Sequence, residues 1–450
     1  MPSPYISNTD ADRTEMLDAI GVSSSADLFL DIPEAYRDPA LDIPRPLSEM
    51  ELLRELKVMA RRNADLDDYA CFLGAGSYNH YIPSVVRHIT GRSEFYTSYT
   101  PYQAEISQGT LQTTYDFQSL VCRLTGMDVA NAGMYDGSTA LAEAALMACR
   151  ITRRKRVVAL DTVSPGYLEI LNSYMEPQDI DVQVMSPSAL NVTEETACLI
   201  CQYPDFYGII EDLGPYAEAS HRAGALLVAS ADPIALGMFR SPGEYDADIV
   251  VGEGQCMGTS PTFGGPYLGL FAARSRHMRQ MPGRIVGKTT DARGREGFVL
   301  TLQTREQHIR RETATSNICT SEALVALALT AYLAALGPRG LRSVAQLSYH
   351  KAHYAAQQIA ALPGYSLPVK GDFFKEFVIQ CPRPPSEINR ALLKDNIIGG
   401  LDLTNSVRPE PSRRTEGLRS GAPNSMLLCV TEMNTRDQID SLVLALSKLS

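Results

Sequence analysis

The chain has 450 residues, enough for a large domain plus a smaller one, and its 44% hydrophobic and 21% charged residues are ordinary for a folded protein. Its formal net charge of -11 argues against the basic face that nucleic-acid binding needs. We find no long uncharged apolar segment and no signal-peptide pattern, so we expect a cytoplasmic protein that does not enter the membrane. Its nine cysteines are scattered, which predicts free thiols and no metal site.

Residues 1–46 are expected to form an N-terminal arm. Within it, residues 9–21 (TDADRTEMLDAIG) have a polar cap, a helical body and a terminal glycine, and the proline-rich piece 31–46 predicts an extended connector. A helix is predicted over 48–64. We place a large domain at 47–320, and bridging helices with a small domain at 321–450.

Two stretches rich in aromatic and polar residues come before the predicted sheet. They are residues 72–83 (FLGAGSYNHYIP) and residues 96–109 (YTSYTPYQAEISQG). Polar side chains lower stability when they are buried without partners, which favours a functional surface for the second stretch. A loop that only covers the edge of the sheet is the alternative.

The middle of the chain alternates short apolar runs with helical segments. Strands are predicted at 156–160, 181–185, 198–203, 225–230 and 248–252, with a helix at 213–223 between two of them. Such βαβ units predict a mainly parallel sheet covered by helices on both faces. The last run, 267–272, follows a short link and is predicted to be an antiparallel strand of the same sheet.

Two residues directly follow the predicted strands, Asp232 after 225–230 and Gln255 after 248–252. This pattern resembles pyridoxal phosphate (PLP) enzymes of fold type I, the aspartate aminotransferase-like transferases. In that fold an aspartate keeps the ring nitrogen protonated and a lysine one strand later forms the Schiff base. Here no lysine occurs between Lys155 and Lys288, and Gln255 occupies the place of the Schiff-base lysine. The resemblance therefore implies no catalytic residue in this chain.

The same resemblance assigns a second part of the cofactor site to the turn before an alanine-rich helix. Asp136 or Ser138 can cap that helix, and in this fold the backbone N–H groups at the positive end of the helix hold the phosphate. The degenerate cofactor site implied in this way consists of Asp136, Gly137, Ser138 and Asp232.

The remainder of the chain predicts a small α+β domain. Residues 275–317 are highly charged and are predicted to be irregular, and apolar helices are predicted at 320–336 and 341–362. Strands are predicted at 373–380 and 426–431, each followed by a helix.

Several longer motifs carry a closer resemblance, and they extend over the whole chain. Together they resemble the α subunit (subunit 1) of two-subunit glycine decarboxylase, the P-protein of the glycine cleavage system. The motifs are DRTEMLDAIGV (12–22), FLGAGSYNHYIP (72–83), YTPYQAEISQG (99–109), QYPDFYG (202–208), TFGGPYLG (262–269), REQHIRRE (305–312) and ATSNICT (314–320). The family's pattern has lysine where this chain has Thr313, a departure that affects a possible charge contact and not the Schiff base.

The resemblance implies an α2β2 heterotetramer in which the β chain keeps the lysine and binds PLP. The implied reaction converts glycine and the lipoyl group of the H-protein to carbon dioxide and aminomethyl-lipoyl H-protein. This chain would supply structure and part of the wall around its partner's site. The candidate wall residues are Tyr99, Tyr102, Gln103, Glu105, Ser107 and Gln108.

Two alternatives remain at the level of sequence. One is a stand-alone PLP decarboxylase that takes its lysine from elsewhere, such as Lys288 in the charged segment. The other is a pure scaffold whose pocket has been retired. A bound chromophore on the isolated chain would favour the first, and insensitivity to changes in residues 99–108 would favour the second.

Overall fold

The computed structural model describes residues 5–37, 39–262, 264–318, 321–404 and 424–449. It divides into two compact units, Met1–Asn63 and Ala64–Ser450. The helix predicted at 48–64 therefore groups with the arm 1–46.

The first unit holds two helices with matching caps. Helix α1 (Asp10–Ile20) begins at a capping box between Thr9 and Asp12 and ends at Gly21, and helix α2 (Glu49–Ala60) begins at a similar box. No residue of α2 is buried, although Leu52, Leu56 and Met59 repeat at helical spacing. Because helices in proteins draw most of their stability from burying such a face, α2 is suited to packing against another surface.

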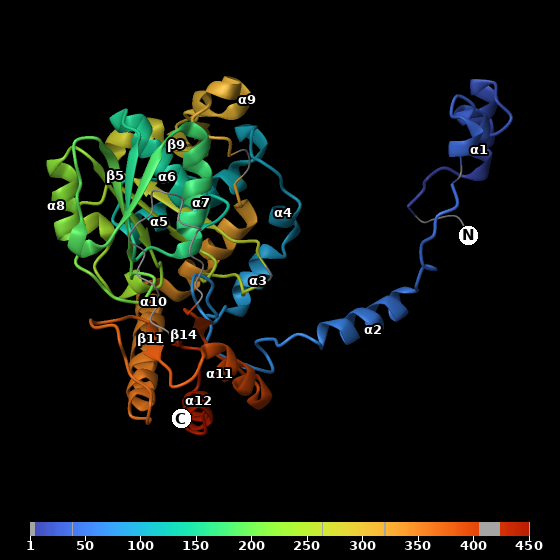
Figure 1. Ribbon diagram of the computed structural model, residues 1–450. Helices are drawn as coiled ribbons and strands as arrows, with labels where there is room; N and C mark the ends of the chain where they lie inside the picture. Colours follow the sequence, from blue (N-terminus) through green and yellow to red (C-terminus); the bar gives the residue numbers. More distant parts are fainter. Residues whose placement is uncertain (1–4, 38, 263, 319–320, 405–423, 450) are drawn as a thin grey trace. The chain divides into compact units, whose positions relative to one another are not determined.

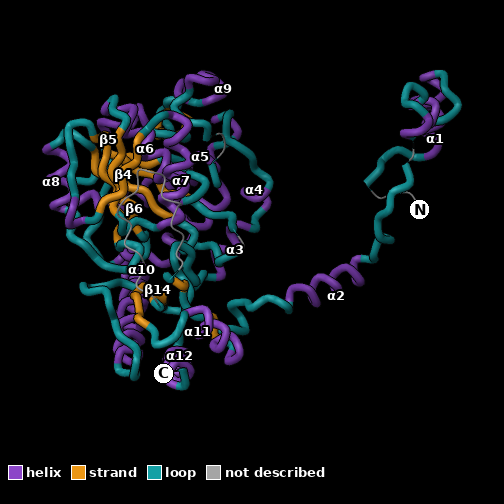
Figure 2. The backbone as a smooth tube through the Cα atoms, in the orientation of Figure 1, coloured by secondary structure: helices purple, strands orange, loops and turns teal. Residues whose placement is uncertain are grey.

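The second unit is built around a seven-stranded sheet with the order β2-β8-β7-β6-β5-β3-β4 (Figures 1 and 2). Strands β3 to β7 are mutually parallel, and β8 runs antiparallel to β7, as the sequence predicted. The strands are β2 (Val129–Ala130), β3 (Arg156–Leu160), β4 (Asp181–Met185), β5 (Thr196–Tyr203), β6 (Leu226–Ala231), β7 (Ile249–Glu253) and β8 (Gly269–Ala273).

Helices cover both faces of this sheet. Helix α8 lies on the opposite side of the strands from α6 and α7 in Figure 1. Helix α6 packs along β5 to β8, because its small alanine side chains allow close approach and eleven of its residues are buried. The α-helices between residues 84 and 222 are α3 (Ser84–Thr90), α4 (Ser93–Tyr96), α5 (Gln108–Thr125), α6 (Gly137–Thr152), α7 (Pro165–Met175) and α8 (Gly214–Arg222).

Helix α10 (Ala323–Ala360) joins the large sheet to a smaller core. It breaks at Gly337, where φ is 61° and ψ is -179°, so it corresponds to the two predicted helices; Thr320, the predicted start, lies outside the described residues. Contrary to our expectation, it is long and apolar enough by composition to cross a membrane. However, it is bent, and its apolar residues fill both cores, with Leu329 in the first and Ile359 in the second. These features are typical of a core helix.

The smaller core lies under a three-stranded antiparallel sheet with the order β11-β14-β13. A short parallel pair, β1 with β12, adjoins it through Phe72, whose backbone bonds to both Ile398 and Cys429. The elements are β1 (Ala70–Cys71), β11 (Glu376–Gln380), α11 (Pro385–Leu392), β12 (Ile397–Ile398), β13 (Leu401–Asp402), β14 (Ser425–Cys429) and α12 (Arg436–Ser447).

The prediction that 275–317 is irregular was wrong. This segment contains a β-hairpin, β9 (Ile285–Thr290) with β10 (Glu296–Thr301), and a short helix α9 (Gln307–Arg310). The charged residues lie at the turn and on the exposed face, whereas Val286 and Phe298 pack on Leu111 of α5. Alternation of apolar and polar residues around a turn with Gly294 at φ 75° was the available signal.

Gly208 allows the start of β11 to approach the large sheet. Its φ is 89°, and a Cβ there would lie 1.9 Å from the carbonyl oxygen of Glu376. We therefore expect Gly208→Ala to destabilise the chain by about 3 kcal/mol or more, because it adds both a clash and backbone strain. Thermal unfolding checks this. Gly166→Ala, on α7, adds a methyl group with nothing within 4 Å of it, and should melt at or above the wild-type temperature. Equal melting of the two variants would contradict the prediction.

Candidate functional site

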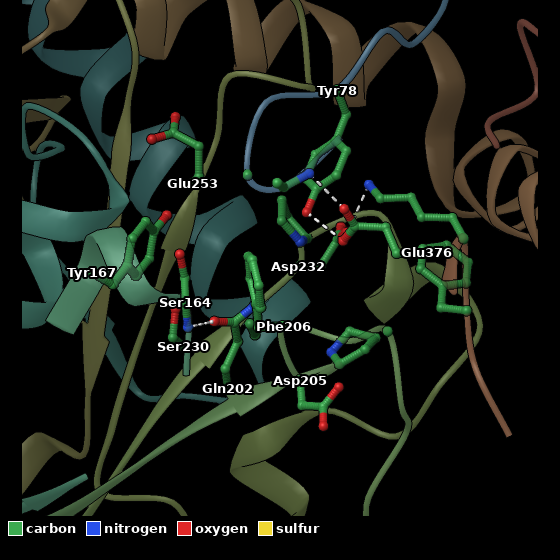
Figure 3. Close-up of a pocket in the computed structure, with 18 residues that line it drawn as sticks. Tyr78, Ser164, Tyr167, Gln202, Asp205, Phe206, Ser230, Asp232, Glu253 and Glu376 are labelled. Carbon is green, nitrogen blue, oxygen red and sulfur yellow. Dashed lines mark hydrogen bonds and ion pairs between the residues drawn. The ribbon is translucent and has the colours of Figure 1, made fainter. Parts of the chain in front are cut away.

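A pocket lies at the carboxyl ends of the parallel strands, the usual place for a ligand in this architecture. Gln202 is the second-last residue of β5, Ser230 lies in β6, and Glu253 ends β7. Tyr78 from the loop 72–83 and Glu376 from β11 close the opposite side (Figure 3). Asp232, directly after β6, is among the lining residues, as the sequence predicted for a strand end.

Asp232 is paired with Lys375, a residue that the sequence analysis did not identify. Lys375 is only 1% exposed, and its Nζ donates to Asp232 Oδ2 at 2.7 Å and to His80 Nε2 at 3.1 Å. The same nitrogen lies 3.5 Å from the centre of the Tyr78 ring. An ammonium group has three N–H donors, so a carboxylate, an imidazole and an aromatic face account for all of them.

The charge state of this cluster follows from its surroundings. Burial lowers the pKa of Lys375, but the Asp232 carboxylate raises it, and the net direction is upward, so the amine stays protonated. Burial and the Lys375 ammonium lower the pKa of His80. A neutral His80 donates from Nδ1 to Glu432 at 2.7 Å and accepts from Lys375 at Nε2. Lys375 is therefore a structural cation and not a free nucleophile.

Gln255, which the resemblance to PLP enzymes assigned to the place of the Schiff-base lysine, is fully buried and holds the loop 72–83. Its Oε1 accepts the N–H of Tyr78 at 3.0 Å, and its Nε2 donates to the carbonyl oxygen of Tyr78 at 3.2 Å and to that of Thr259. The amide thus forms a two-sided bond with one backbone residue. A lysine has no acceptor and could not make this pair.

Tyr78 is fixed at its other end by Glu376. Its hydroxyl donates to Glu376 Oε2 at 2.8 Å, and the other carboxyl oxygen accepts the N–H of Ala75 at 2.6 Å (Figure 3). Burial raises the pKa of Glu376 to about 7. The ring of Tyr78 is consequently held over the Lys375 ammonium by contacts at both its backbone and its hydroxyl.

The second predicted part of the cofactor site, at the start of α6, is filled by two carboxyl groups. Asp136 Oδ1 accepts the N–H of Ser138 at 2.8 Å and that of Thr139 at 3.0 Å. Glu253 Oε2 accepts the remaining first-turn N–H, from Gly137, at 2.9 Å. All three N–H groups that could bind an anion at this helix end therefore already have acceptors.

Glu253 is held by two further backbone donors. Its Oε1 accepts the N–H of Gln255 at 2.9 Å and that of Leu268 at 3.0 Å. Burial raises the pKa of Glu253 to about 7 against the opposing effect of these hydrogen bonds. There is little room beside it: a Cβ on Gly137 would lie 2.4 Å from the Tyr167 hydroxyl, which faces Glu253 in Figure 3.

As arranged here, these residues do not fit PLP. The position that would form the covalent bond holds an amide, and the partner expected for the ring nitrogen is neutralised by an ammonium. The amides expected for the phosphate bind carboxyl groups, which would repel a second anion. We therefore derive no cofactor chemistry from this pocket.

The six candidate wall residues lie together, around a short 3-10 turn and the first residue of α5. None of them is among the described residues that line the pocket. Tyr99 is 75% exposed, and Gln103 and Glu105 are also exposed. Tyr102 is half-exposed; its hydroxyl accepts from Arg284 Nη2 at 3.0 Å, and that guanidinium lies 5.1 Å from the ring centre.

The last two candidate wall residues, Ser107 and the exposed Gln108, have structural contacts within their own chain. Ser107 is the N-cap of α5 and is partly buried. Gln108 bonds to the backbone of Phe298 in β10 in both directions, at 2.8 and 2.9 Å. Gln108 therefore anchors α5 to the hairpin, which gives it a structural role whatever the neighbouring residues do.

Two other predicted positions lie away from the pocket. Lys288 is on β9, half-exposed, and forms an ion pair with Glu296 across the hairpin. Thr313 donates from its hydroxyl to the carbonyl oxygen of Arg310 at 2.8 Å, which closes the turn after α9. Lys288 is thus poorly placed to serve as the lysine of a stand-alone enzyme.

The residues that sequence reasoning missed are Lys375, Glu376, Glu253 and His80. For the first three, the available signal in the sequence was a charged residue beside or at the end of an apolar strand. Lys375 and Glu376 open the run FVIQ of β11, and Glu253 ends the buried strand β7. Charged groups in such places are costly unless they are paired, so they point to partners from distant parts of the chain.

Comparison with known proteins gives the same identification along the whole chain. Residues 3–446 match the family model described as glycine cleavage system P-protein. The chain is 52% identical over 450 residues to the probable glycine dehydrogenase (decarboxylating) subunit 1 of Thermomicrobium roseum, covering 98% of both chains. It is 49% identical to the protein of that name from Desulforamulus reducens, covering 99% of this chain and 100% of the relative.

Solved structures agree on the fold. A crystal structure of glycine decarboxylase (P-protein) of the glycine cleavage system, in inhibitor-bound form, superposes with a TM-score of 0.89 at 41% identity, over 100% of both chains. Sphingosine-1-phosphate lyase of Burkholderia pseudomallei shares the fold alone, with a TM-score of 0.60 at 16% identity over 93% of this chain and 94% of that one. The predicted fold, PLP-dependent transferase fold type I, is confirmed. This chain belongs to the glycine cleavage system P-protein family.

Proposed function

We propose that this chain acts as the α subunit of a two-subunit glycine decarboxylase. One observation carries the proposal: a chain related over its full length to proteins named subunit 1 has Gln255 at the Schiff-base position and Lys375 against Asp232. Such a subunit needs a partner that supplies the lysine. The activity belongs to the assembled enzyme, and the chain alone is inactive.

In this proposal the β subunit binds PLP, and the assembly is an α2β2 heterotetramer in the cytoplasm. The bond between the α-carbon and the carboxylate of glycine breaks, and carbon dioxide leaves. The remaining carbon bonds to one sulfur of the lipoyl disulfide on the H-protein, while the other sulfur becomes a thiol. The cofactor of the partner supplies the electron sink for this chemistry. The α chain provides a rigid wall and excludes water.

The exposed stretch around residues 99–106 supports a shared wall. Tyr99 and Ile106 are 75% and 80% exposed in the second unit. Aromatic residues are enriched at subunit interfaces, because they bury a large area at a low entropic cost. The adjacent Gln103 and Glu105 add polar groups that can orient glycine or the lipoyl arm. Neither alternative from the sequence has comparable support, although a scaffold without a catalytic contribution remains an outcome of the tests below.

Co-expression with the candidate β chain tests the division of labour. We expect glycine decarboxylation from the co-purified subunits and none from either chain alone. After borohydride reduction, mass spectrometry should find the cofactor on a lysine of the β chain. Cofactor covalently fixed to this chain, or activity of this chain alone, would contradict the proposal.

Variants of the 99–108 stretch test the wall. We expect Tyr99→Phe and Glu105→Gln to lower the turnover of the complex by between about tenfold and about 10³-fold. The melting temperature of the complex should not fall, because these groups act in the reacting complex. Tyr102→Phe should lower both quantities, since its hydroxyl also accepts from Arg284.

Tyr96→Phe is the matched control, an exposed tyrosine in the same segment but outside the candidate set. It should keep wild-type turnover. If Tyr99→Phe and Glu105→Gln also keep wild-type turnover in the intact complex, the stretch is only structural and the shared wall is refuted.

A further inference from the structure

Two side chains of opposite charge type, the buried Lys375 and the partly buried Glu253, contact the groups that would hold the cofactor. Lys375 Nζ lies 2.7 Å from Asp232 Oδ2, and Glu253 Oε2 accepts the N–H of Gly137 at 2.9 Å. They come from different segments, since Lys375 directly precedes β11 and Glu253 ends β7, and both line the same pocket. A positive group thus faces the Asp232 carboxylate, and an oxygen acceptor faces the N-terminus of α6.

We propose that Lys375 and Glu253 are internal substitutes for the cofactor: the Lys375 ammonium pairs with Asp232 in place of the ring nitrogen, and the Glu253 carboxyl takes the backbone N–H groups in place of the phosphate. The inference deepens the proposed function, on which it rests for the identity of the excluded cofactor. It states what excludes PLP from this chain besides the absent lysine.

The contacts of Lys375 explain why it is an effective substitute. Asp232, whose side chain is 12% exposed, would alone be a poorly compensated charge, and removing one partner of a largely buried pair is destabilising. Lys375 also uses its other donors on His80 and the Tyr78 ring, so no N–H of the ammonium is left without an acceptor. The pair is therefore satisfied without a ligand.

Glu253 performs the same task for the amides. It accepts N–H groups from Gly137, Gln255 and Leu268, and the oxygens can accept these bonds in the ionised or the protonated state. Removal of its side chain would free those three donors near the positive end of α6, an arrangement that suits a phosphate.

The substitution also fixes the loop 72–83 without a cofactor. Lys375 lies under the Tyr78 ring, Glu376 binds the Tyr78 hydroxyl, and Gln255 binds the Tyr78 backbone. The loop thus keeps one conformation in a chain whose pocket holds no ligand, and this conformation is available to the β subunit at assembly.

Binding of pyridoxamine 5′-phosphate tests the proposal. This probe has the ring nitrogen and the phosphate but no aldehyde, so its binding does not depend on a lysine at position 255. The protein is the full chain co-purified with the β subunit, whose own cofactor has first been fixed by borohydride, so that further binding belongs to this chain. If borohydride fixes no cofactor on the β subunit, the proposed function fails, and the titration is then performed on this chain alone.

We expect no saturable binding of pyridoxamine 5′-phosphate to the wild type. The Glu253→Ala/Lys375→Ala variant should bind it saturably, with an affinity at least about tenfold higher than any residual binding by the wild type. The control Glu387→Ala/Lys394→Ala removes one exposed charge of each sign and should behave as the wild type. Equal binding by the wild type and the Glu253→Ala/Lys375→Ala variant, or absence of binding to that variant when it is folded, would overturn the proposal.

A thermal unfolding cycle decides the case if the double alanine variant does not fold. Lys375→Met and Asp232→Asn should each lower the melting temperature, and the double variant Asp232→Asn/Lys375→Met should recover most of the loss, because it leaves no unpaired charge. A double variant that melts no higher than Lys375→Met would show that Lys375 only fills space, and would refute the charge substitution.

Discussion

The ion pair between Lys375 and Asp232 connects the parts of the second unit. Asp232 directly follows β6 of the large sheet and Lys375 directly precedes β11 of the small sheet, so the ion pair at 2.7 Å joins the two. Lys375 is buried and the Asp232 side chain is only 12% exposed, and losing one partner of a fully buried pair costs on the order of 3–5 kcal/mol, which is the upper bound here. The position of the Tyr78 ring over the ammonium and the hydrogen bond from Lys375 to His80 both depend on this contact.

The approach of the two sheets depends in turn on the backbone. The N–H of Phe374 donates to the carbonyl oxygen of Gly208 at 3.0 Å, and Ile209 forms a bridge with Phe373. These bonds bring β11 against the turn that follows β5. Since Lys375 and Glu376 are the next residues of that segment, the conformation of Gly208 determines where their charges arrive.

The sequence alone predicted most of the fold, because it is set by local pattern. Short buried runs bounded by turn residues predicted β3 to β8 to within two residues, and the carboxyl end of a parallel strand located Asp232. The hairpin at 285–301 was missed because charged residues at and near its turn interrupt the alternation of apolar and polar residues around Phe298. Lys375 and Glu253 were missed for a different reason: their partners come from distant segments, and no local spacing indicates such a pairing.

The pocket also explains how this chain can keep its fold without a Schiff-base lysine and without a cofactor. A bound cofactor stabilises a folded chain by an amount that rises with the logarithm of its concentration over its dissociation constant, so a chain that depends on it is less stable when the cofactor is scarce. An internal cation and an internal acceptor are always present at their sites. Gln255 then gains a use that a lysine could not serve, since it holds both the N–H and the carbonyl oxygen of Tyr78. A lysine introduced at position 255 alone would therefore not create a cofactor site. It would release the loop 72–83 from Gln255 and would leave Asp232 paired with Lys375.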